Sequence, residues 1–565
     1  MSGAERSHSD PILAIMPNDA QSPAEVELLE LRVLDGPNRY FTRPAVKLDF
    51  GAEAPGPASD VAATAGLAVR RLHVALDLPV PRVMVRPSAD RRRVSLVFPW
   101  RRRATAQAIG AAAARLALGQ SNERREIRGL AAVASGPRPD LPRPRIPIVA
   151  VTGTNGKSTT TRLIAHIAES AGRRTGMTNS DGIYLRGRLV EAGDWTGFGG
   201  AARVLAESEL DLAVLETARG GILLRGIGYS ANDVAVVTNV SADHLGLQGI
   251  DTLDELADVK AAVVRITKRS GWAVLNAADP RVWAMRRQTR ARWYPFSTDP
   301  HAPQVDDALD RDGRAAVLQR GWMVLLAPGR PPRRLARVVD LPITFAGLSQ
   351  YNVANALAAA AAADAIGIEP DQIAAGLRSF ALDSADNPGR LNLYERTGVL
   401  ALVDFAHNEA GLSGLLEVCR SLASAPGRRA RGRVRGKVRL AVGTAGDRTD
   451  EILHNLGVVA AGADDVVICE KRHYLRGRDL EAMNTILREG IAEGGYSDAV
   501  PALETELGSL QALLARSRRG DVVAVMSHVE RAEIFAWLAT EGYRPVDHDR
   551  LRELVGPLVA VRATR

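Results

Sequence analysis

The sequence IPIVAVTGTNGKSTTTRLIAHIAESAG occupies residues 146–172 and indicates the fold of the central part of the chain. An apolar run comes first, a glycine-rich turn follows, and residues 158–172 have the composition of a helix. Two further apolar runs, LAVLET at 212–217 and VAVVTNV at 234–240, are separated by polar or helical stretches. Continuous apolar strands that alternate with helices are typical of a parallel, doubly wound sheet. We therefore predict an α/β fold with such a sheet.

The flanking regions predict two further units. After residue 387 four more apolar strands alternate with helices, at 399–405, 437–442, 465–470 and 521–526, which predicts a Rossmann-like C-terminal domain. Residues 26–50 alternate apolar and polar positions around a Gly-Pro-Asn turn, and residues 94–98 and 104–118 read as a strand and a helix. This pattern predicts a small α+β domain at the N-terminal side.

Domain boundaries are predicted from composition. Five prolines in the thirteen residues 135–147 exclude a helix or a central strand there, so this stretch is expected to be a linker. A length of 565 residues also favours several domains. The expected division is a disordered tail at 1–25, an N-terminal α+β domain at 26–134, the linker at 135–147, a central domain at 148–386 and a C-terminal domain at 387–565.

The composition excludes several classes of protein. With 46% hydrophobic and 24% charged residues, the chain is neither disordered in bulk nor collagen-like. It has no apolar run long enough to span a bilayer and no recognisable export signal, so we expect a cytoplasmic protein without a membrane partner. The two cysteines, Cys419 and Cys469, are expected to be core thiols. A net charge of +8 permits an anionic partner without identifying one.

The strongest chemical signal is the loop TGTNGKST at 152–159. Backbone N–H groups of a glycine-rich loop at a helix N-terminus bind polyphosphate, while the lysine neutralises charge and the serine hydroxyl ligates Mg²⁺. The loop departs from the full G-x-x-x-x-G-K-[ST] pattern, because Val151 takes the place of the first glycine. ATP binding is the favoured interpretation, and an ordinary glycine-rich turn between a strand and a helix is the alternative.

Three more residues are candidates for a metal site. Glu216 ends an apolar strand, His244 follows another in the segment SADHLG, and Lys260 lies on an expected helix. Carboxyl ends of parallel strands are where ligands bind such sheets. Each residue also has an ordinary structural explanation when taken alone: a capping or surface carboxylate, a loop histidine and a solvated lysine.

Taken together, the order and spacing of these motifs resemble the Mur ligase family of ATP-dependent carboxylate–amine ligases. Lys260 follows His244 by sixteen residues, as in that family's pattern. Three segments are more similar still to the Mur-like half of cyanophycin synthetases: ETARGGIL at 216–223, TNV with DHLGL at 238–247, and Arg476-Gly477-Arg478. The resemblance covers residues 148–540 and implies a Mur-ligase-like central P-loop domain followed by a Rossmann-like one.

The resemblance also implies roles for individual residues. The ATP phosphates would be held by Gly153, Thr154, Asn155, Gly156, Lys157, Ser158 and Thr159. Ser158 and Glu216 would hold one Mg²⁺, and His244 would help to hold a second. Lys260 matches a lysine that is carbamylated in much of this family and positions that second ion.

Further matches concern the nucleotide. Asn352 and Asn355 match a pair near the adenine, Arg390 matches an arginine that reaches the phosphates across the domain cleft, and Asp404 matches a ribose-binding aspartate. A planar guanidinium suits phosphate, and a carboxylate at a strand end suits a ribose diol. The implied catalytic residues are Lys157, Glu216, His244, Lys260 and Arg390.

The N-terminal segment LRVLDGPN at 31–38 resembles the start of cyanophycin synthetases, which carry an ATP-grasp domain between this region and the Mur-like half. Roughly a hundred residues separate the Gly-Pro-Asn turn from the TGTNGKS loop, too few for an ATP-grasp domain. We therefore expect that module to be missing. The resemblance then implies only the second of the two ligase reactions, in which an amino acid such as arginine is attached to a carboxylate.

The expected function is an ATP-dependent, acyl-phosphate-forming ligase that joins an amino acid to an acidic peptide or small acid, with a homo-oligomer left open. Residues 181–184 and 196–197 are expected to border the acid, and the arginine-rich stretch 428–437 is either a solvated loop or a site for a polyanion. A folylpolyglutamate or peptidoglycan-precursor type ligase and a catalytically weak ATP-binding regulator are the alternatives. A nucleic acid partner is not expected, because aromatic stacking motifs are missing.

Overall fold

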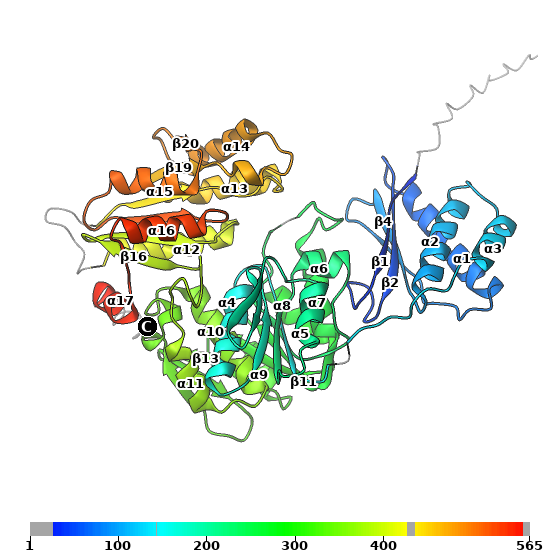
Figure 1. The fold of residues 1–565 in the computed structure, drawn as a ribbon, viewed down its shortest axis with the longest axis horizontal. Coiled ribbons are helices and arrows are strands. Elements are labelled where there is room, and N and C mark those ends of the chain that lie inside the picture. The colour runs from blue at the N-terminus through cyan, green and yellow to red at the C-terminus, as the bar shows by residue number, and fades with distance from the viewer. Residues whose placement is uncertain (1–25, 143, 244, 426–434, 557–565) are drawn as a thin grey trace, which may run out of the picture.

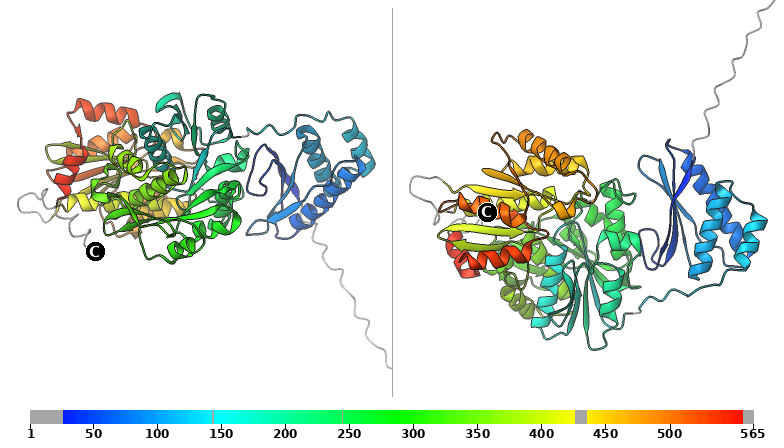
Figure 2. Two further views of the ribbon diagram at one scale, coloured as in Figure 1. Left: turned by 90° about the horizontal axis from the view of Figure 1, so that it is seen from below. Right: turned by 45° about the horizontal axis from the view of Figure 1, so that its top comes forward.

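Three β-sheets organise the chain in the computed structural model, which describes residues 26–142, 144–243, 245–425 and 435–556. The unit built on each sheet is called the N-terminal, central or C-terminal unit below. The central unit lies between the other two (Figures 1 and 2). The expected tail at 1–25 lies outside the described residues.

The central sheet has eleven strands in the order β15-β14-β13-β12-β11-β10-β5-β9-β6-β7-β8. Strands from β13 to β6 run parallel, and antiparallel hairpins form both edges. The strands are β5 (Ile148–Thr152), β6 (Thr175–Thr178), β7 (Gly182–Leu185), β8 (Arg188–Ala192), β9 (Leu212–Glu216), β10 (Asn232–Val237), β11 (Thr267–Asn276), β12 (Arg292–Ser297), β13 (Ala315–Gln319), β14 (Trp322–Leu326) and β15 (Arg333–Arg337).

Helices cover both faces of the central sheet, because alternate residues of a strand point to opposite sides. Val149 and Val151 of β5 pack with α4, α10 and α11, whereas Ile148 and Ala150 pack with α5, α6 and α7. The helices are α4 (Lys157–Ser170), α5 (Phe198–Leu205), α6 (Arg219–Leu224), α7 (Leu253–Arg265), α8 (Pro280–Ala284), α9 (Pro303–Leu309), α10 (Gln350–Ala365) and α11 (Pro370–Ser379). The predicted α/β fold with a parallel, doubly wound sheet is confirmed.

The C-terminal sheet has seven strands in the order β20-β19-β18-β21-β17-β16-β22, and those from β20 to β17 are parallel. Its helices again cover both faces. The strands are β16 (Asn392–Arg396), β17 (Val399–Asp404), β18 (Val438–Val442), β19 (Asp465–Cys469), β20 (Ala502–Leu503), β21 (Val522–Met526) and β22 (Arg544–Pro545). The helices are α12 (Glu409–Ala423), α13 (Asp450–Ala460), α14 (Leu480–Glu493), α15 (Glu506–Ala515), α16 (Arg531–Thr540) and α17 (His548–Val555).

The N-terminal unit has a four-stranded antiparallel sheet in the order β1-β2-β4-β3, with helices on one face. Figure 1 shows its other face turned towards α6 and α7 of the central unit. Its elements are β1 (Glu27–Leu34), β2 (Ala45–Gly51), α1 (Pro57–Ala75), β3 (Met84–Pro87), β4 (Arg93–Pro99), α2 (Arg103–Ala117) and α3 (Glu123–Ala131). The α+β architecture predicted for this region is therefore present.

The Gly-Pro-Asn turn docks the N-terminal unit onto the central unit. The amide of Asp35 donates to the carbonyl of Arg225 at 2.8 Å, and the amide of Ile227 donates to the carbonyl of Pro37 at 2.7 Å. The backbones approach so closely that a Cβ atom on Gly36 would overlap the carbonyl of Ile227. Glycine at position 36 is therefore explained by this contact rather than by the turn alone.

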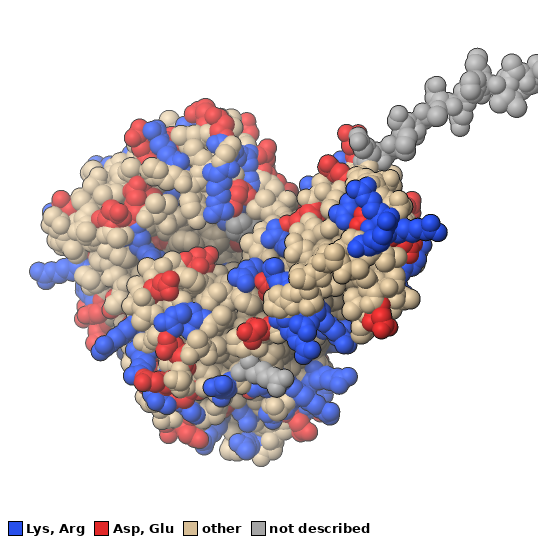
Figure 3. All heavy atoms as spheres, turned by 45° about the vertical axis from the view of Figure 1, so that its right-hand side comes forward, with Lys and Arg blue, Asp and Glu red and all other residues tan. Residues whose placement is uncertain are grey.

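Charged side chains of both signs are mixed over the face of the molecule that Figure 3 shows. Of the arginine-rich stretch 428–437, residues 428–434 lie outside the described part of the chain. Arg435 pairs with Asp464 at 2.7 Å. In the described ranges, no helix is long and apolar enough to cross a membrane.

Candidate functional site

The glycine-rich loop joins the end of β5 to the start of α4. Gly156 adopts a left-handed conformation, with φ of 83°, and a side chain there would run into the carboxamide of Asn355. The loop is fixed from the neighbouring strand end, because Thr154 N donates to the Asn239 carbonyl at 2.9 Å and Asn155 N donates to Asn239 Oδ1 at 2.9 Å. The segment after β10 therefore holds the loop in shape before any ligand binds.

Lys157, Ser158 and Glu216 meet at the carboxyl end of the central sheet. The Ser158 hydroxyl donates to Glu216 Oε2 at 2.8 Å, and Lys157 Nζ donates to the Thr154 carbonyl at 2.8 Å. Burial raises the pKa of the Glu216 carboxyl, which the Lys157 ammonium partly offsets. A hydroxyl and a carboxylate fit Mg²⁺, because this ion binds through one or two protein oxygens and takes phosphate oxygens and waters for the rest.

Lys260 reaches the same loop from α7. Its Nζ donates to the carbonyl of Gly153 at 2.5 Å, and the side chain is buried. Burial lowers the pKa of Lys260 well below its usual range, and the nearby Lys157 ammonium lowers it further. His244 lies outside the described residues, but the adjacent Asp243 contacts Arg448 at 3.3 Å and His407 at 3.5 Å in the C-terminal unit.

Asn352 and Asn355 lie on the first turns of α10 and are both buried. Asn355 Nδ2 donates to Asn352 Oδ1 at 3.0 Å, and the Asn355 carboxamide lies against Gly156 of the glycine-rich loop. The rest of the helix is buried through the alanine run 356–363, whose small side chains allow close packing against α4. This packing fixes the pair of asparagines beside the loop.

Asp404 and Arg390 belong to the C-terminal unit. The Asp404 carboxylate ends β17 and accepts from the amides of Leu391 at 2.8 Å and Ala406 at 2.7 Å. Burial raises the pKa of Asp404, against the opposing charge of Arg390. The Arg390 guanidinium lies 4.1 Å from the centre of the Phe405 ring, and within the described part of the chain its Nη1 atom has no hydrogen-bond partner. Burial lowers the pKa of Arg390.

One cavity of about 1040 Å³ between the central and C-terminal units brings these residues together. Its lining includes every predicted site residue that the structure describes: Gly153, Thr154, Asn155, Gly156, Lys157, Ser158, Thr159, Glu216, Lys260, Asn352, Asn355, Arg390 and Asp404. Thr196 and Gly197, which we expected near the acid, also line it.

Other expected neighbours of the acid do not line this cavity. Asp181 instead pairs with Arg162 at 3.0 Å and, across the two units, with Arg531 at 2.9 Å. Tyr184 packs beside Arg162, whose guanidinium carbon lies 4.7 Å from the ring centre. Asp181 therefore contacts the C-terminal unit next to the cavity.

Several residues in or beside the cavity were not foreseen from the sequence. Beside it, Asn408 exchanges two hydrogen bonds with Asn155, at 3.0 and 3.1 Å, and so joins the C-terminal unit to the glycine-rich loop. Arg219, Arg448 and His528 line the cavity itself. Arg219 lies inside the ETARGGIL segment that carries the family resemblance, so a signal for it existed.

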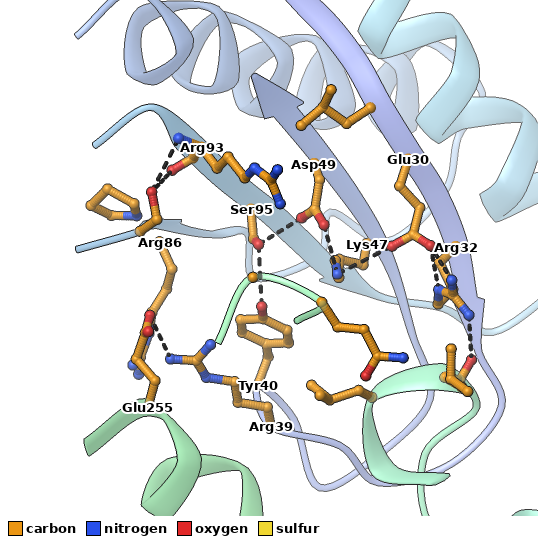
Figure 4. A pocket seen from close by; sticks show the side chains of 17 residues that line it. Glu30, Arg32, Arg39, Tyr40, Lys47, Asp49, Arg86, Arg93, Ser95 and Glu255 are labelled. Carbon is orange, nitrogen blue, oxygen red and sulfur yellow. Dashed lines mark hydrogen bonds and ion pairs between the residues drawn. The ribbon is translucent and has the colours of Figure 1, made fainter. Parts of the chain in front are cut away.

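A second cavity, of about 180 Å³, lies between the N-terminal sheet and the central unit (Figure 4). Its charged groups largely pair with one another: Lys47 contacts Asp49 at 2.7 Å and Glu30 at 3.3 Å, and Arg39 contacts Glu255 at 3.4 Å. Leu224 and Gln248 line both cavities, so the two adjoin each other along α6.

Comparisons with known proteins agree with this geometry. Residues 151–363 match the Mur ligase middle domain. A cyanophycin synthetase from Crocosphaera subtropica is 38% identical over 381 residues, which are 67% of this chain and 42% of that protein. A UDP-N-acetylmuramoyl-L-alanyl-D-glutamate–2,6-diaminopimelate ligase from Gloeobacter violaceus is 29% identical over 399 residues, 68% of this chain and 73% of that protein. The chain thus spans less than half the length of the cyanophycin synthetases it matches.

Solved structures show the same fold. The structure of Escherichia coli FolC in complex with DHPP and ADP superposes with a TM-score of 0.51 at 17% identity, covering 71% of this chain and 90% of that one. At this identity the likeness concerns the fold alone.

Proposed function

Because this chain belongs to the Mur ligase family, we propose that it is an ATP-dependent ligase that joins an amino acid to a carboxylate through an acyl phosphate. The single observation that carries the proposal is the common cavity, onto which Lys157, Ser158, Glu216, Arg390 and Asp404 all converge from two units. A cavity between two units suits a reaction that must align three reactants and exclude water.

The glycine-rich loop is the proposed site of the ATP phosphates. Its amides and Lys157 would hold them, while Asp404 and the pair Asn352 and Asn355 would hold the nucleoside. Arg390 supports this assignment, because it lines the cavity from the opposite unit and its buried Nη1 has no hydrogen-bond partner in the ranges that the structure describes. Its contact with phosphate would therefore require the two units to be close together.

Ser158 and Glu216 are the proposed protein ligands of one Mg²⁺. The ion would supply positive charge against the phosphate oxygens during transfer to the substrate carboxylate. Lys260 is proposed to be carbamylated and to act with His244 at a second ion. The lowered pKa of Lys260 supports this, because carbon dioxide reacts with the neutral amine. Carbamylation would also replace the lysine ammonium, which would repel a cation.

The proposed chemistry has two steps. A substrate carboxylate attacks the γ-phosphorus of ATP and displaces ADP, and an amine then attacks the acyl phosphate and displaces phosphate. The similarity to cyanophycin synthetases favours an acidic peptide or small acid as the acid substrate and a basic amino acid such as arginine as the amine.

The test is to incubate the purified chain with ATP, Mg²⁺ and panels of amino acids and acidic peptides, and to record ADP release together with product mass. A product equal in mass to acid plus amine minus water, formed with one ADP, is the expected result. The variant Lys157→Ala is the negative control. ADP release without any condensed product would contradict the ligase assignment and favour a regulatory ATP-binding protein.

A further inference from the structure

Buried arginines in this protein are usually paired with a carboxylate. Arg39 contacts Asp258 at 3.1 Å, Arg162 contacts Asp181 at 3.0 Å, and Arg439 contacts Asp521 at 3.2 Å. This pairing is expected, because a guanidinium taken out of water needs charge and hydrogen-bond compensation. Two half-buried arginines that line the large cavity, Arg219 and Arg390, form no ion pair within the described residues.

Arg219 retains unused hydrogen-bond donors inside the cavity. Its Nη2 donates to the carbonyl of Leu247, whereas its buried Nε has no hydrogen-bond partner among the described residues. Burial lowers the pKa of Arg219, although the group is still charged at neutral pH. A guanidinium has five N–H donors in a planar fork, so Arg219 can still receive an anionic group.

The surroundings of Arg219 differ from those of Arg390. The negative charges of Asp181, Asp404 and Glu216, which lie around the proposed nucleotide site, oppose the lowering of the Arg390 pKa by burial. For Arg219, the lowering of the pKa by burial is opposed by Asp243 and Asp447 and increased by Arg448 instead. The charge of Arg219 also adds to the effect of burial in lowering the pKa of Lys260, so Arg219 lies near the proposed place of the second ion. The two arginines therefore lie in different regions of one cavity.

We propose that Arg219 binds a substrate carboxylate that does not itself react. It would thereby select for substrates that carry such a carboxylate. This inference rests on the proposed function. With the phosphates assigned to the glycine-rich loop and Arg390, the anion left for Arg219 is a carboxylate, for which the planar fork is suited. Two sources supply that chemistry: an additional carboxylate of the acid substrate, or the α-carboxylate of the incoming amino acid.

The position of α6 would bring a substrate bound at Arg219 close to the proposed Mg²⁺ site. Arg219 begins this helix three residues after Glu216, the proposed Mg²⁺ ligand at the end of β9. A substrate held at Arg219 would therefore share the cavity with Glu216, to which the short connection between β9 and α6 joins it. A group held on such a connection can set the orientation of the substrate as well as its affinity.

The experiment compares wild type with Arg219→Gln and Arg219→Lys. Arg225→Gln is the matched control, because Arg225 follows the same helix, is exposed and lines neither cavity. In one arm the acid is aspartyl-aspartate or its C-terminal amide, and in the other arm the amine is L-arginine or L-argininamide. Both kcat/KM and equilibrium binding in the presence of a non-hydrolysable ATP analogue are measured.

The expected result is a coupling between Arg219 and one carboxylate. Wild type and Arg225→Gln should prefer the carboxylate over its amide by about 10- to 100-fold in the arm that supplies the ligand. Arg219→Gln should lose this preference mainly through KM, and Arg219→Lys should keep part of it. The arm in which the preference disappears identifies the source of the carboxylate.

An Arg219→Gln variant that discriminates acid from amide as wild type does, in both arms, overturns the proposal. Equal losses for acid and amide also overturn it, because they indicate that Arg219 only supports the loop at Leu247. If wild type forms no product with any pair, the proposed function fails, and the binding comparison still decides the role of Arg219. Unchanged binding of the ATP analogue and an unchanged unfolding temperature show that the variant is folded.

Discussion

Replacing Glu506 by alanine should strongly destabilise the C-terminal unit. The Glu506 side chain is 2% exposed, at the start of α15. Its carboxylate pairs with Lys471 and accepts from the amides of His528 at 2.7 Å and Glu530 at 3.0 Å. One buried carboxylate thus joins the segment after β19 to the loop after β21, which carries the cavity residue His528.

The magnitude follows from what the substitution leaves behind. Lys471 would remain 2% exposed, with the carbonyl of Met526, at 2.6 Å, as its remaining contact among the hydrogen bonds of the described chain. Breaking a buried ion pair by removing one partner costs about 3–5 kcal/mol. In a unit of this size each kcal/mol lowers the Tm by about 2–4 °C, so we expect a decrease of about 6–20 °C.

The assay is differential scanning calorimetry of the full chain, in which the transition of the C-terminal unit is followed. Glu493→Ala is the matched control, because Glu493 lies on the same unit, is 69% exposed and pairs with His454 at 3.2 Å. Such a surface pair contributes at most about 1 kcal/mol. A Glu506→Ala Tm within about 3 °C of wild type would refute the reasoning.

The same contact has a defined pH dependence. Burial would raise the pKa of Glu506, but Lys471 and the backbone amides outweigh it, and the net pKa is lowered. A carboxyl whose pKa is lower in the folded state stabilises the fold above the unfolded value of about 4.3, and this contribution is lost as the pH falls. The difference in Tm between wild type and Glu506→Gln should therefore be steady from pH 5 to 8 and decrease below about pH 4.

Four further outcomes are expected. Lys157→Ala should abolish amide formation without changing the Tm, and normal turnover would refute the phosphate-loop assignment. Glu216→Gln should raise the Mg²⁺ concentration for half-maximal activity by on the order of 10-fold, and an unchanged titration would exclude it as a ligand. Asn408→Ala should raise the KM for ATP about fivefold, because it removes the amide pair with Asn155; a change in kcat alone would contradict this. Removal of bicarbonate should reversibly lower activity if Lys260 is carbamylated, and activity that does not depend on bicarbonate would argue against it.

The sequence predicted those features that follow from short-range patterns. Strand β5 and helix α4 were expected from one continuous stretch, and the residues at the carboxyl ends of parallel strands, such as Glu216, were expected at one edge of the sheet. The fold of the central and C-terminal units could be inferred for the same reason. The proposed nucleotide-binding roles of Asn355 and Asp404 came from family resemblance rather than from periodicity.

Contacts between distant segments could not be predicted. Asn155 and Asn408 are separated by 253 positions, and no local pattern indicates that their amides face each other. Asp181 was expected near the acid because residues 181–184 recur in the cyanophycin-synthetase-like pattern, and that pattern does not show its pairing with Arg531 of the other unit. Arg219 lies in a recognised motif, but only the structure shows that its Nε lacks a partner among the described residues. Such facts depend on how segments that are distant in the sequence are placed in the fold.

The contacts between the central and C-terminal units are of two kinds, and the difference explains how the cavity can respond to ligands. Phe345, Ala346 and Leu348 of the central unit pack into the apolar core of the C-terminal unit, and this burial does not depend on any ligand. Around the cavity the contacts are polar, such as Asn155 with Asn408 and Asp181 with Arg531. The net contribution of such polar pairs is smaller, because hydrogen bonds to water replace them when the units separate. We therefore expect the apolar contact to keep the units connected, and charged ligands in the cavity to influence how closely the two units approach around it.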